Sequence, residues 1–361
     1  MKILLLSKYS RKGASSRLRS LQYLPFLAAE GFQVTVSSLF DDQYLDQLYR
    51  QGRRAPLHVM VLYLRRLRVL LSVLRYDLIW IEKEIFPHMP ALAERILRWL
   101  GKRYVVDFDD AIFHNYDLSG NPVLRQIMGQ KIDVVMRCAD WVVAGNDYLA
   151  NRAKMAGAAC VELVPTVVDA ARYSPTGSSA ASRPVIGWIG SPSTQSYVVD
   201  IARILKVQCQ KHDARLLLVG ASVDIANEFP GVDVEVVTWS EASEAELIAR
   251  MDIGIMPLSD GPWEKGKCGY KLIQYMACGI PVIASPVGVN VDIVGMNQCG
   301  MLAASIAEWD VALDKLLESP AQRLQLGSAG RQAVENRYSL SVQAPVLAGI
   351  FTQCMTGPES V

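Results

Sequence analysis

The sequence predicts an α/β fold made of two doubly wound domains, each a parallel sheet covered by helices. The chain has 361 residues, which is enough for two domains of ordinary size. Short apolar runs rich in β-branched residues alternate with helical stretches in both halves. Strands that are apolar along their whole length indicate sheets with helices on both faces, because neither face then meets water.

Apolar runs in each half are expected to form the strands of one sheet. In the first half these are Ile3–Leu6, Gln33–Ser37, Leu78–Glu82, Tyr104–Phe108 and Trp141–Ala144. In the second half they are Val185–Ile189, Leu216–Val219, Val232–Val237, Ile253–Pro257 and Pro281–Ala284. Two such series predict two Rossmann-like domains.

The domain boundary is expected near Pro165–Pro175. Prolines there, and the Ser/Ala-rich segment that follows, are typical of a linker. We therefore expect a first domain over residues 1–168 and a second over 169–340. Residues 341–361 are expected to form a helix that crosses back to the first domain.

The charge pattern gives no indication of nucleic-acid binding, because the net charge is only +1. The two halves differ, however. Residues 1–168 hold 23 Lys and Arg against 16 Asp and Glu, whereas the remainder holds 14 against 20. This asymmetry indicates that the first half faces an anionic surface.

Seven arginines of the first half lie in the segment Arg50–Arg75, interleaved with Leu, Val, Met and Tyr. One interpretation is a basic amphipathic helix that lies on an anionic membrane. The other is an ordinary surface helix whose arginine stems cover apolar neighbours. The positive charge of the whole region favours the membrane.

The seven cysteines are scattered and form no CxxC pair, which indicates neither a zinc site nor a disulfide framework. The apolar positions at the start are five, Met1 and Ile3–Leu6, which is short for a signal peptide. No apolar run approaches the roughly 20 residues of a membrane-spanning helix. We expect a cytoplasmic chain with reduced thiols, peripheral on the inner face of the cell membrane.

Two loops of the first domain carry candidate site residues. In the loop after the first strand, Gly13 and its serine neighbours can present backbone N–H groups to an anion, and Arg17 adds positive charge. After Tyr104–Phe108, Asp109 and Asp110 follow Asp107 closely. Such carboxylates can orient a substrate hydroxyl or transfer a proton. The alternative is a helix cap with a solvated loop.

The second domain opens with a similar loop at Gly190, Ser191 and Thr194, which favours a phosphate site. It lacks the GxGxxG spacing of dinucleotide-binding folds, so hydride chemistry has little support. Trp239, at the end of a later strand, can stack on a base or close the core; both interpretations stay open.

Pro257–Asn290 is the segment richest in candidate residues. A helix is expected from near Gly269 to Cys278, and its N-terminus lies close to Lys267 and Lys271. A helix N-terminus with nearby lysines favours a pyrophosphate. The Gln274 amide, one turn further on, can bond to ribose or sugar oxygens. Gly288 is expected in the loop after the next strand; the alternative for the lysines is a solvated helix face.

The run KLIQYMACGIPVIASPVG resembles the retaining glycosyltransferases of the GT-B fold, specifically the large GT4-type group, also called group 1. The resemblance implies two Rossmann-like domains that face a central cleft. It further implies a nucleoside diphosphate sugar bound mainly by the second domain and an acceptor bound by the first. Hexosyl transfer with retention of configuration and without a metal ion is expected from it.

The chain departs from that group at several site positions. Where members carry two glutamates eight residues apart, this chain has Gly266 and Gln274. Ser191 and Thr194 stand where Arg and Lys often bind phosphate, and Asp109 or Asp110 replaces a common histidine. The resemblance therefore implies a variant subfamily.

In that subfamily the expected catalytic residues are Asp109, Asp110 and Lys267. Lys267 and Lys271 are expected to neutralise the phosphates, with Tyr270 among the donor-binding residues. The expected acceptor is a lipid-linked molecule or a growing surface glycan, as in polysaccharide biosynthesis. Two alternatives remain: a GT-B subunit that binds without turnover, which the lost glutamates favour, and a nucleotide-sugar epimerase.

Overall fold

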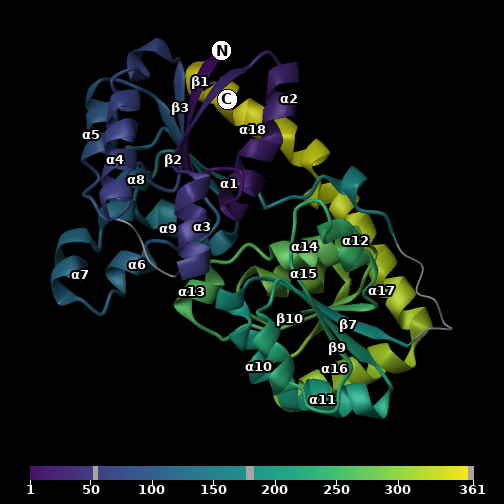
Figure 1. Ribbon diagram of the computed structural model, residues 1–361. Coiled ribbons are helices and arrows are strands. Elements are labelled where there is room, and N and C mark those ends of the chain that lie inside the picture. Colours follow the sequence, from purple (N-terminus) through teal and green to yellow (C-terminus); the bar gives the residue numbers. More distant parts are fainter. Residues whose placement is uncertain (52–55, 176–182, 357–361) are drawn as a thin grey trace. The chain divides into compact units, whose positions relative to one another are not determined.

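A computed structural model describes residues 1–51, 56–175 and 183–356 (Figure 1). The chain divides into two compact units. Unit 1 comprises Met1–Thr166, Gly266–Cys268 and Gln343–Val361, and unit 2 comprises Val167–Lys265 and Gly269–Val342. Each unit contains a six-stranded parallel sheet flanked by helices. The predicted two-domain α/β fold is confirmed.

Unit 1 has the strand order β2-β1-β3-β4-β5-β6. Strands β3 and β4 are buried along their whole length, as expected of central strands in a covered parallel sheet. The elements are β1 (Lys2–Tyr9), α1 (Ala14–Arg19), η1 (Leu21–Tyr23), α2 (Leu24–Ala29), β2 (Gln33–Phe40), α3 (Asp42–Gln51), α4 (Pro56–Leu70), η2 (Val73–Arg75), β3 (Leu78–Glu82), α5 (Leu92–Trp99), β4 (Tyr104–Phe108), α6 (His114–Asp117), α7 (Pro122–Met128), α8 (Lys131–Cys138), β5 (Trp141–Ala144), α9 (Asp147–Met155) and β6 (Val161–Leu163).

Unit 2 has the strand order β12-β11-β10-β7-β8-β9. Its core lies on both faces of this sheet, around β7, β8 and β10. The elements are η3 (Ala170–Arg172), β7 (Val185–Ile189), η4 (Pro192–Thr194), α10 (Ser196–Asp200), α11 (Ala202–Lys211), β8 (Arg215–Val219), η5 (Val223–Glu228), β9 (Val234–Val237), α12 (Glu244–Ala249), β10 (Ile253–Met256), α13 (Pro262–Lys265), α14 (Tyr270–Ala277), β11 (Val282–Ala284), α15 (Val289–Asn297), β12 (Gly300–Leu302), α16 (Ile306–Glu318), α17 (Pro320–Ala333) and η6 (Val334–Tyr338).

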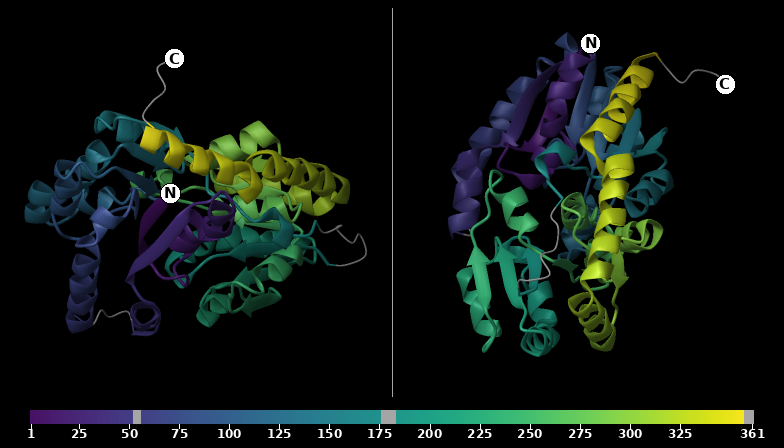
Figure 2. Two further views of the ribbon diagram at one scale, coloured as in Figure 1. Left: turned by 90° about the horizontal axis from the view of Figure 1, so that it is seen from above. Right: turned by 90° about the vertical axis from the view of Figure 1, so that its right-hand side faces the viewer.

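Helix α18 (Leu340–Thr356) is continuous but belongs to both units, since Leu340–Val342 group with unit 2 and the rest with unit 1 (Figure 2). In unit 1 the Phe351 ring is fully buried and lies 5.0 Å from the Trp80 ring, centre to centre. Residues 341–361 had been expected to form such a helix, and residues 357–361 lie outside the described part of the chain.

The predicted basic helix is present as α4, which covers Pro56–Leu70. Residues 52–55 of the segment Arg50–Arg75 lie outside the described residues, as do residues 176–182 of the expected linker. Among the described helices, none is both long and apolar enough to cross a bilayer.

Candidate active site

Charged side chains gather at the carboxyl edge of the unit 1 sheet. Strands β1, β3, β4 and β5 are parallel neighbours, so the loops that follow them meet at one edge. Glu82 ends β3 and is followed by Lys83, while Asp109 and Asp110 follow β4. A site was expected at this edge because of its acids. The structure adds the cations that accompany them.

Asp107, the acid nearest the strand interior, is held in a buried ion pair. Arg19 donates from Nε and Nη2 to the two carboxylate oxygens of Asp107, each at 2.8 Å. Burial raises the pKa of Asp107, and the charge of Arg19 opposes that rise. A buried, bidentate pair of this kind fixes α1 against β4. Asp107 is therefore part of the scaffold of the site.

Lys83 joins Asp109 and Asp110, the two partly buried acids that follow β4. Its Nζ lies 2.7 Å from Oδ1 of Asp109 and 3.1 Å from Oδ2 of Asp110, and it donates to Ser15 Oγ at 3.0 Å. The side chain is buried, and its backbone has φ of 65°. Burial works against the charged amine, but the two carboxylates outweigh it and raise the pKa of Lys83 well above its ordinary value.

The pKa values of Asp109 and Asp110 are shifted in opposite directions although both carboxyls pair with Lys83. Burial raises the pKa of both carboxyls, but at Asp109 the Lys83 ammonium outweighs burial and holds the pKa below its ordinary value of 3.8. At Asp110 the pKa stays raised, because burial and the charge of Asp109 outweigh the nearby cations. Carboxyls whose pKa values are separated in this way are suited to different acid and base roles.

The loop that carries Lys267 is bound to unit 1. Asn146, which follows β5, donates from Nδ2 to the carbonyl oxygens of Gly266 and Lys267, at 3.0 Å and 2.9 Å. Cys268 Sγ donates to the carbonyl of Asp109 at 3.1 Å. These bonds fix the backbone of the loop beside the acidic pair. Asn146 had not been identified from the sequence, because an asparagine after a strand usually reads as a helix cap.

Gly266, at a position where the family resemblance implies a glutamate, is required by this packing. A Cβ on Gly266 would lie 2.4 Å from Cβ of Ala111, so a side chain would displace the loop. The positive charge of Lys267 opposes the rise that burial causes in the pKa of Asp110. Lys267 thus belongs with the acids of unit 1, whereas Lys271, its expected partner, belongs to unit 2.

The remaining unit 1 candidates, Gly13 and Arg17, form the turn before α1 and its first helical turns. A Cβ on Gly13 would lie 2.3 Å from Cβ of Tyr9, so the turn requires glycine. Arg17 is buried and donates from Nη1 to the carbonyl of Arg11 at 3.3 Å. Its guanidinium therefore supports the loop, and its expected role in donor binding stays a prediction.

In unit 2 the N-terminus of α14 follows Gly269, whose φ of 65° is left-handed. A Cβ at Gly269 would lie 2.5 Å from Cδ1 of Ile293, so the loop packs closely against α15. Tyr270 and Lys271 open the helix, and Lys271 Nζ lies 5.2 Å from the centre of the buried Trp188 ring. This cation–π contact keeps a positive charge beside the helix N-terminus, an arrangement suited to an anion.

The loop after β11 supports the same helix terminus. Gly288 has φ of 53°, and a Cβ there would lie 2.8 Å from the carbonyl oxygen of Lys265. Asn290 is buried and donates from Nδ2 to the carbonyl of Ser285 at 3.2 Å. Its Oδ1, which lies 3.7 Å from where a Gly269 Cβ would be, meets no hydrogen-bond donor within the described part of the chain. A buried acceptor in this state is suited to a ligand hydroxyl.

The loop after β7 closes on itself. Thr194 N donates to the carbonyl of Ser191 at 2.9 Å, and Ser191 N donates to Oγ1 of Thr194 at 3.3 Å. A Cβ on Gly190 would lie 2.2 Å from the Trp188 ring. The loop thus stands directly over the tryptophan that Lys271 contacts, and this brings two of the predicted donor segments together.

Gln274 and Trp239 are linked through two residues that the sequence did not single out, Tyr173 and Glu244. Gln274 is buried and donates from Nε2 to the hydroxyl of Tyr173 at 3.3 Å. Tyr173 donates to Oε1 of Glu244 at 2.8 Å, and Trp239 Nε1 donates to Oε2 of Glu244 at 2.9 Å. Glu244 is therefore a buried carboxylate that is linked to Gln274 through the Tyr173 hydroxyl. These bonds hold Trp239 and Gln274 inside unit 2.

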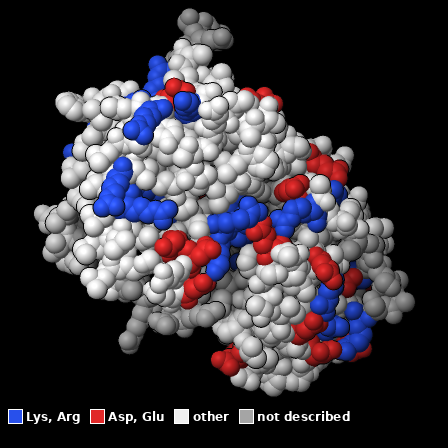
Figure 3. Space-filling model, turned by 45° about the horizontal axis from the view of Figure 1, so that its top comes forward, with Lys and Arg blue, Asp and Glu red and all other residues white. Residues whose placement is uncertain are grey.

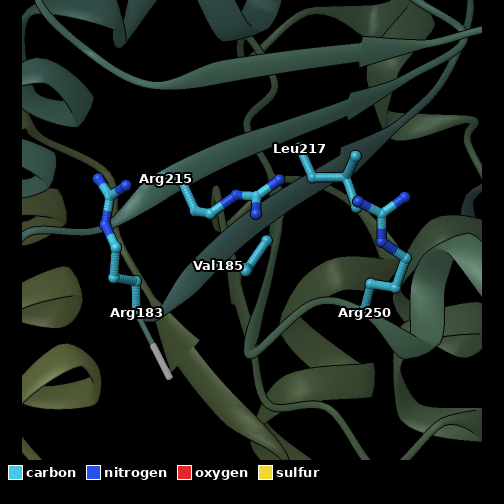
Figure 4. Close-up of a pocket in the computed structure, with 5 residues that line it drawn as sticks. All are labelled: Arg183, Val185, Arg215, Leu217 and Arg250. Atoms are coloured by element: carbon cyan, nitrogen blue, oxygen red, sulfur yellow. The ribbon is translucent and has the colours of Figure 1, made fainter. Parts of the chain in front are cut away.

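A separate cavity of about 350 Å³ opens at the amino ends of the unit 2 strands (Figure 4). Its lining residues are Arg183, Val185, Arg215, Leu217 and Arg250. Arg183 pairs with Asp233 at 3.0 Å, and Arg215 and Arg250 share Glu235. Figure 3 shows the same mixture of charges over unit 2, at lower right. Because acids already neutralise the guanidinium groups, we assign no ligand here.

Comparison with known proteins connects these elements to a family. Residues 183–319 match the family model described as glycosyl transferases group 1. A D-inositol 3-phosphate glycosyltransferase of Segniliparus rotundus is 26% identical over 218 residues. That match covers 55% of this chain and 48% of the relative, so the matched part spans about half of the relative's length.

Solved structures resemble the chain over nearly its whole length. Sucrose-phosphate synthase of Thermosynechococcus elongatus has a TM-score of 0.75 at 15% identity and covers 99% of both chains. HepE of Anabaena in complex with UDP has a TM-score of 0.70 at 17% identity, over 98% of this chain and 100% of its own. WaaG, a glycosyltransferase involved in lipopolysaccharide biosynthesis, has a TM-score of 0.69 at 14% identity, over 98% and 100%.

At these identities the structural likeness establishes the fold alone. The family model, however, covers β7 to α16 and so includes the loop after β7, the start of α14 and Asn290. The fold and the family model agree with the resemblance carried by the run KLIQYMACGIPVIASPVG. The chain therefore has a GT-B fold, and its residues 183–319 match the group 1 glycosyltransferases.

Proposed function

We propose that the chain transfers a hexose from a nucleoside diphosphate sugar to an acceptor, with retention of configuration at the anomeric carbon. The observation that carries the donor half is the start of α14. There a helix N-terminus, Lys271 over Trp188, and the unpartnered Oδ1 of Asn290 lie within the segment that matches the family model. The helix N-terminus offers N–H groups to a phosphate, and Lys271 offers positive charge. Oδ1 of Asn290 can accept a hydrogen bond from a hydroxyl of the donor.

The chemistry is assigned to the cluster of Lys83, Asp109, Asp110 and Lys267 in unit 1. In the proposed step the acceptor oxygen attacks the anomeric carbon while the bond from that carbon to the leaving phosphate breaks. The acceptor proton passes to the phosphate, on the same face. Asp109, held ionised by Lys83, orients the acceptor hydroxyl, and Asp110 holds a proton more readily.

Lys267 and Lys271 are proposed to neutralise the leaving pyrophosphate, so that transfer requires no added metal ion. Transfer should then survive EDTA. A loss of activity in EDTA that Mg²⁺ or Mn²⁺ restores would contradict this part of the proposal.

The acceptor is proposed to be a lipid-linked molecule or a growing glycan at the inner face of the cell membrane. Two features support this: the excess of positive charge in residues 1–168, and the exposed apolar side of α4. WaaG, whose fold resembles that of this chain, is a glycosyltransferase involved in lipopolysaccharide biosynthesis.

A thermal-shift screen of nucleoside diphosphates and their sugars tests the donor site. A ligand that binds the folded chain at about 100 times its Kd stabilises it by about 2.7 kcal/mol, which gives a clear rise in Tm. Lys271→Ala should weaken that ligand by about tenfold or more, because a charge-assisted contact to phosphate is lost. Lys315→Ala, an exposed lysine of α16, is the matched control.

Three outcomes would count against the proposal. If no nucleoside diphosphate or its sugar raised the Tm at millimolar concentration, the proposed donor site would be wrong. Binding without transfer or donor hydrolysis would favour a non-catalytic subunit. Isomerisation of the donor sugar without an acceptor would favour an epimerase.

A further inference from the structure

Helix α4 exposes an apolar stripe on its outer side. Leu62 and Arg66 point into unit 1 and are buried, whereas residues three and four positions apart on the other side are exposed. Leu71, which follows the helix, is 81% exposed. The exposed apolar residues are Leu57, Met60, Val61, Leu64, Leu67 and Leu71, with Leu74 after them.

Helix α5 exposes a second apolar group. Trp99 is 83% exposed, although tryptophan is usually among the better buried residues. The rest of this group is Met89, Leu92, Ile96 and Leu100. On the inner side of the same helix Glu94 and Leu97 are buried. Both helices thus leave their outer sides apolar after they have packed.

The two apolar groups lie on one face of the sheet. Along the order β2-β1-β3-β4, the connections from β2 to β3 and from β3 to β4 run in the same direction. Right-handed crossovers place the helices of both connections, α4 and α5, on the same face (Figure 1). Lys102, just after α5, donates to the carbonyl of Tyr76 at 2.8 Å, and Tyr63 of α4 donates to the carbonyl of Pro87 at 2.7 Å.

The charged residues of this face are almost all basic. From Pro56 to Lys102 the acids Glu82, Glu84 and Glu94 are buried, and Asp77 is the one exposed acid. The exposed arginines are Arg65, Arg68, Arg75, Arg95 and Arg98. Arg68 stands within the apolar stripe of α4, one helical turn from Leu64 and Leu71.

We propose that the outer sides of α4 and α5, together called the α4–α5 face, dock on the surface of an anionic lipid bilayer. The apolar side chains enter the boundary between headgroups and acyl chains, and the arginines stay among the lipid phosphates. Trp99 is suited to that boundary because its ring is apolar and its Nε1–H is polar. At 15 residues α4 is too short to span the bilayer, so it lies in the plane of the surface.

Docking at the bilayer would bring the chain to the surface where a lipid-linked acceptor is presented. This role of the α4–α5 face rests on the proposed function. A protein partner is the less favoured occupant. Protein interfaces are depleted of charge at their centre, whereas here the arginines are interleaved with the apolar stripe.

Sedimentation of the full chain with vesicles tests the surface. We expect binding to vesicles of phosphatidylcholine with phosphatidylglycerol, weaker binding at raised salt, and little binding to phosphatidylcholine alone. The paired variants Leu64→Ser/Leu71→Ser and Ile96→Ser/Trp99→Ser should each lower the partition coefficient by about tenfold or more. The matched control Met296→Ser/Leu324→Ser removes equally exposed apolar residues of unit 2 and should change it less than about twofold.

Brominated acyl chains give a second measurement, since they quench tryptophan only at contact. Wild-type fluorescence should be quenched in anionic vesicles, and Trp99→Phe should remove most of that quenching. Circular dichroism of each variant checks that it is folded.

The proposal fails if the folded chain does not bind anionic vesicles at low salt, or if the paired variants bind as the wild type does. It also fails if the same variants abolish self-association in the absence of lipid, since the α4–α5 face would then be an interface between copies. Lys271→Ala should keep vesicle binding. A chain that binds vesicles but does not transfer a sugar would therefore contradict the proposed function and leave the α4–α5 face in place. A chain that transfers a sugar but does not bind vesicles would contradict only the proposed role of the α4–α5 face.

Discussion

At the scale of the residue, the conformation and contacts of Lys83 support the proposal that the acids of unit 1 take part in transfer. A residue with a side chain costs about 1–2 kcal/mol in the left-handed region, where Lys83 has φ of 65°. That conformation places the ammonium between Asp109 and Asp110, which would otherwise repel each other in a buried setting. Strained backbone of this kind concentrates at functional sites.

Replacement of Lys83 by methionine should change the pH dependence of transfer. Lys83 stabilises the charged form of both carboxyls, so its removal raises the pKa of Asp109 and Asp110 and moves the acidic limb of the kcat/KM profile to higher pH, by about one unit or more. At neutral pH, kcat should fall by about 100-fold or more. Steady-state kinetics from pH 4 to about 9 measure both effects.

Lys12→Met is the matched control, because Lys12 pairs with Asp46 at 2.9 Å in an exposed position of a neighbouring loop. It should leave the profile unchanged. A Lys83→Met enzyme with lower activity but an unshifted acidic limb would show that Lys83 only supports the fold.

The sequence indicated the acids and Lys267 but not Lys83, which pairs with both Asp109 and Asp110. Asp109 and Asp110 stand out because acids directly after an apolar strand are unusual. The contact of these acids with Lys83 depends on the pairing of β3 with β4 and on the positive φ of Lys83. Neither can be predicted from one amino-acid sequence. Glu244 was missed for the same reason, since its partners Tyr173 and Trp239 come from other segments.

At the scale of the element, the part of helix α18 from Gln343 onward packs in the core of unit 1, far in sequence from the strands that it covers. Phe351 contacts Trp80 and lies 6.2 Å from Phe32, ring centre to ring centre. Arg103 donates from Nη1 to the carbonyl of Met355 at 2.7 Å. These contacts give a terminal helix the role that an internal helix has in most doubly wound sheets.

Phe351→Ala should destabilise the chain by about 3–5 kcal/mol, because a fully buried ring leaves a cavity between α18 and the sheet. Val346→Ala, at a half-exposed position of the same helix, should cost less than about 1 kcal/mol. Urea unfolding followed by circular dichroism measures both. Equal effects of the two variants would mean that α18 does not pack on unit 1.

The strands were predicted best where burial is complete. Leu78–Glu82, Tyr104–Phe108, Trp141–Ala144 and Val185–Ile189 have the predicted bounds, because a run buried on both faces must be apolar throughout. Strands β6 and β12 were not predicted. Each has three residues and is only partly buried, so neither length nor composition distinguishes it from a loop.

At the scale of the whole molecule, the cysteines fit a chain whose thiols are protected by burial. All seven lie in the described part of the chain, and no disulfide joins them. Five are buried, and Cys138 and Cys160 are partly exposed. Burial raises the pKa of Cys209, Cys278 and Cys299 to about 12.

We therefore expect slow modification of the native chain by thiol reagents at pH 8. The thiolate is the reactive form, and a pKa of about 12 leaves it scarce at that pH, so at most the two partly exposed thiols should react quickly. In denaturant all seven should react at a common rate. Absorbance with a chromogenic disulfide counts them. Fast reaction of more than two native thiols would contradict the burial.

The division of the chain into two units was only partly predictable from the sequence. A proline-rich boundary is visible near residue 168, and contacts divide between Thr166 and Val167. The membership of Gly266–Cys268 in unit 1 could not be seen, because it depends on Asn146, 120 positions earlier in the chain.

That three-residue loop constrains how such chains can recombine. A crossover near residue 167 would replace unit 2 by that of a relative. It would also replace Gly266–Cys268 and most of α18, which belong to unit 1. A functional chimaera must restore both pieces to the parent of its first unit. A single crossover therefore cannot exchange one complete unit for another, although the chain folds into two units.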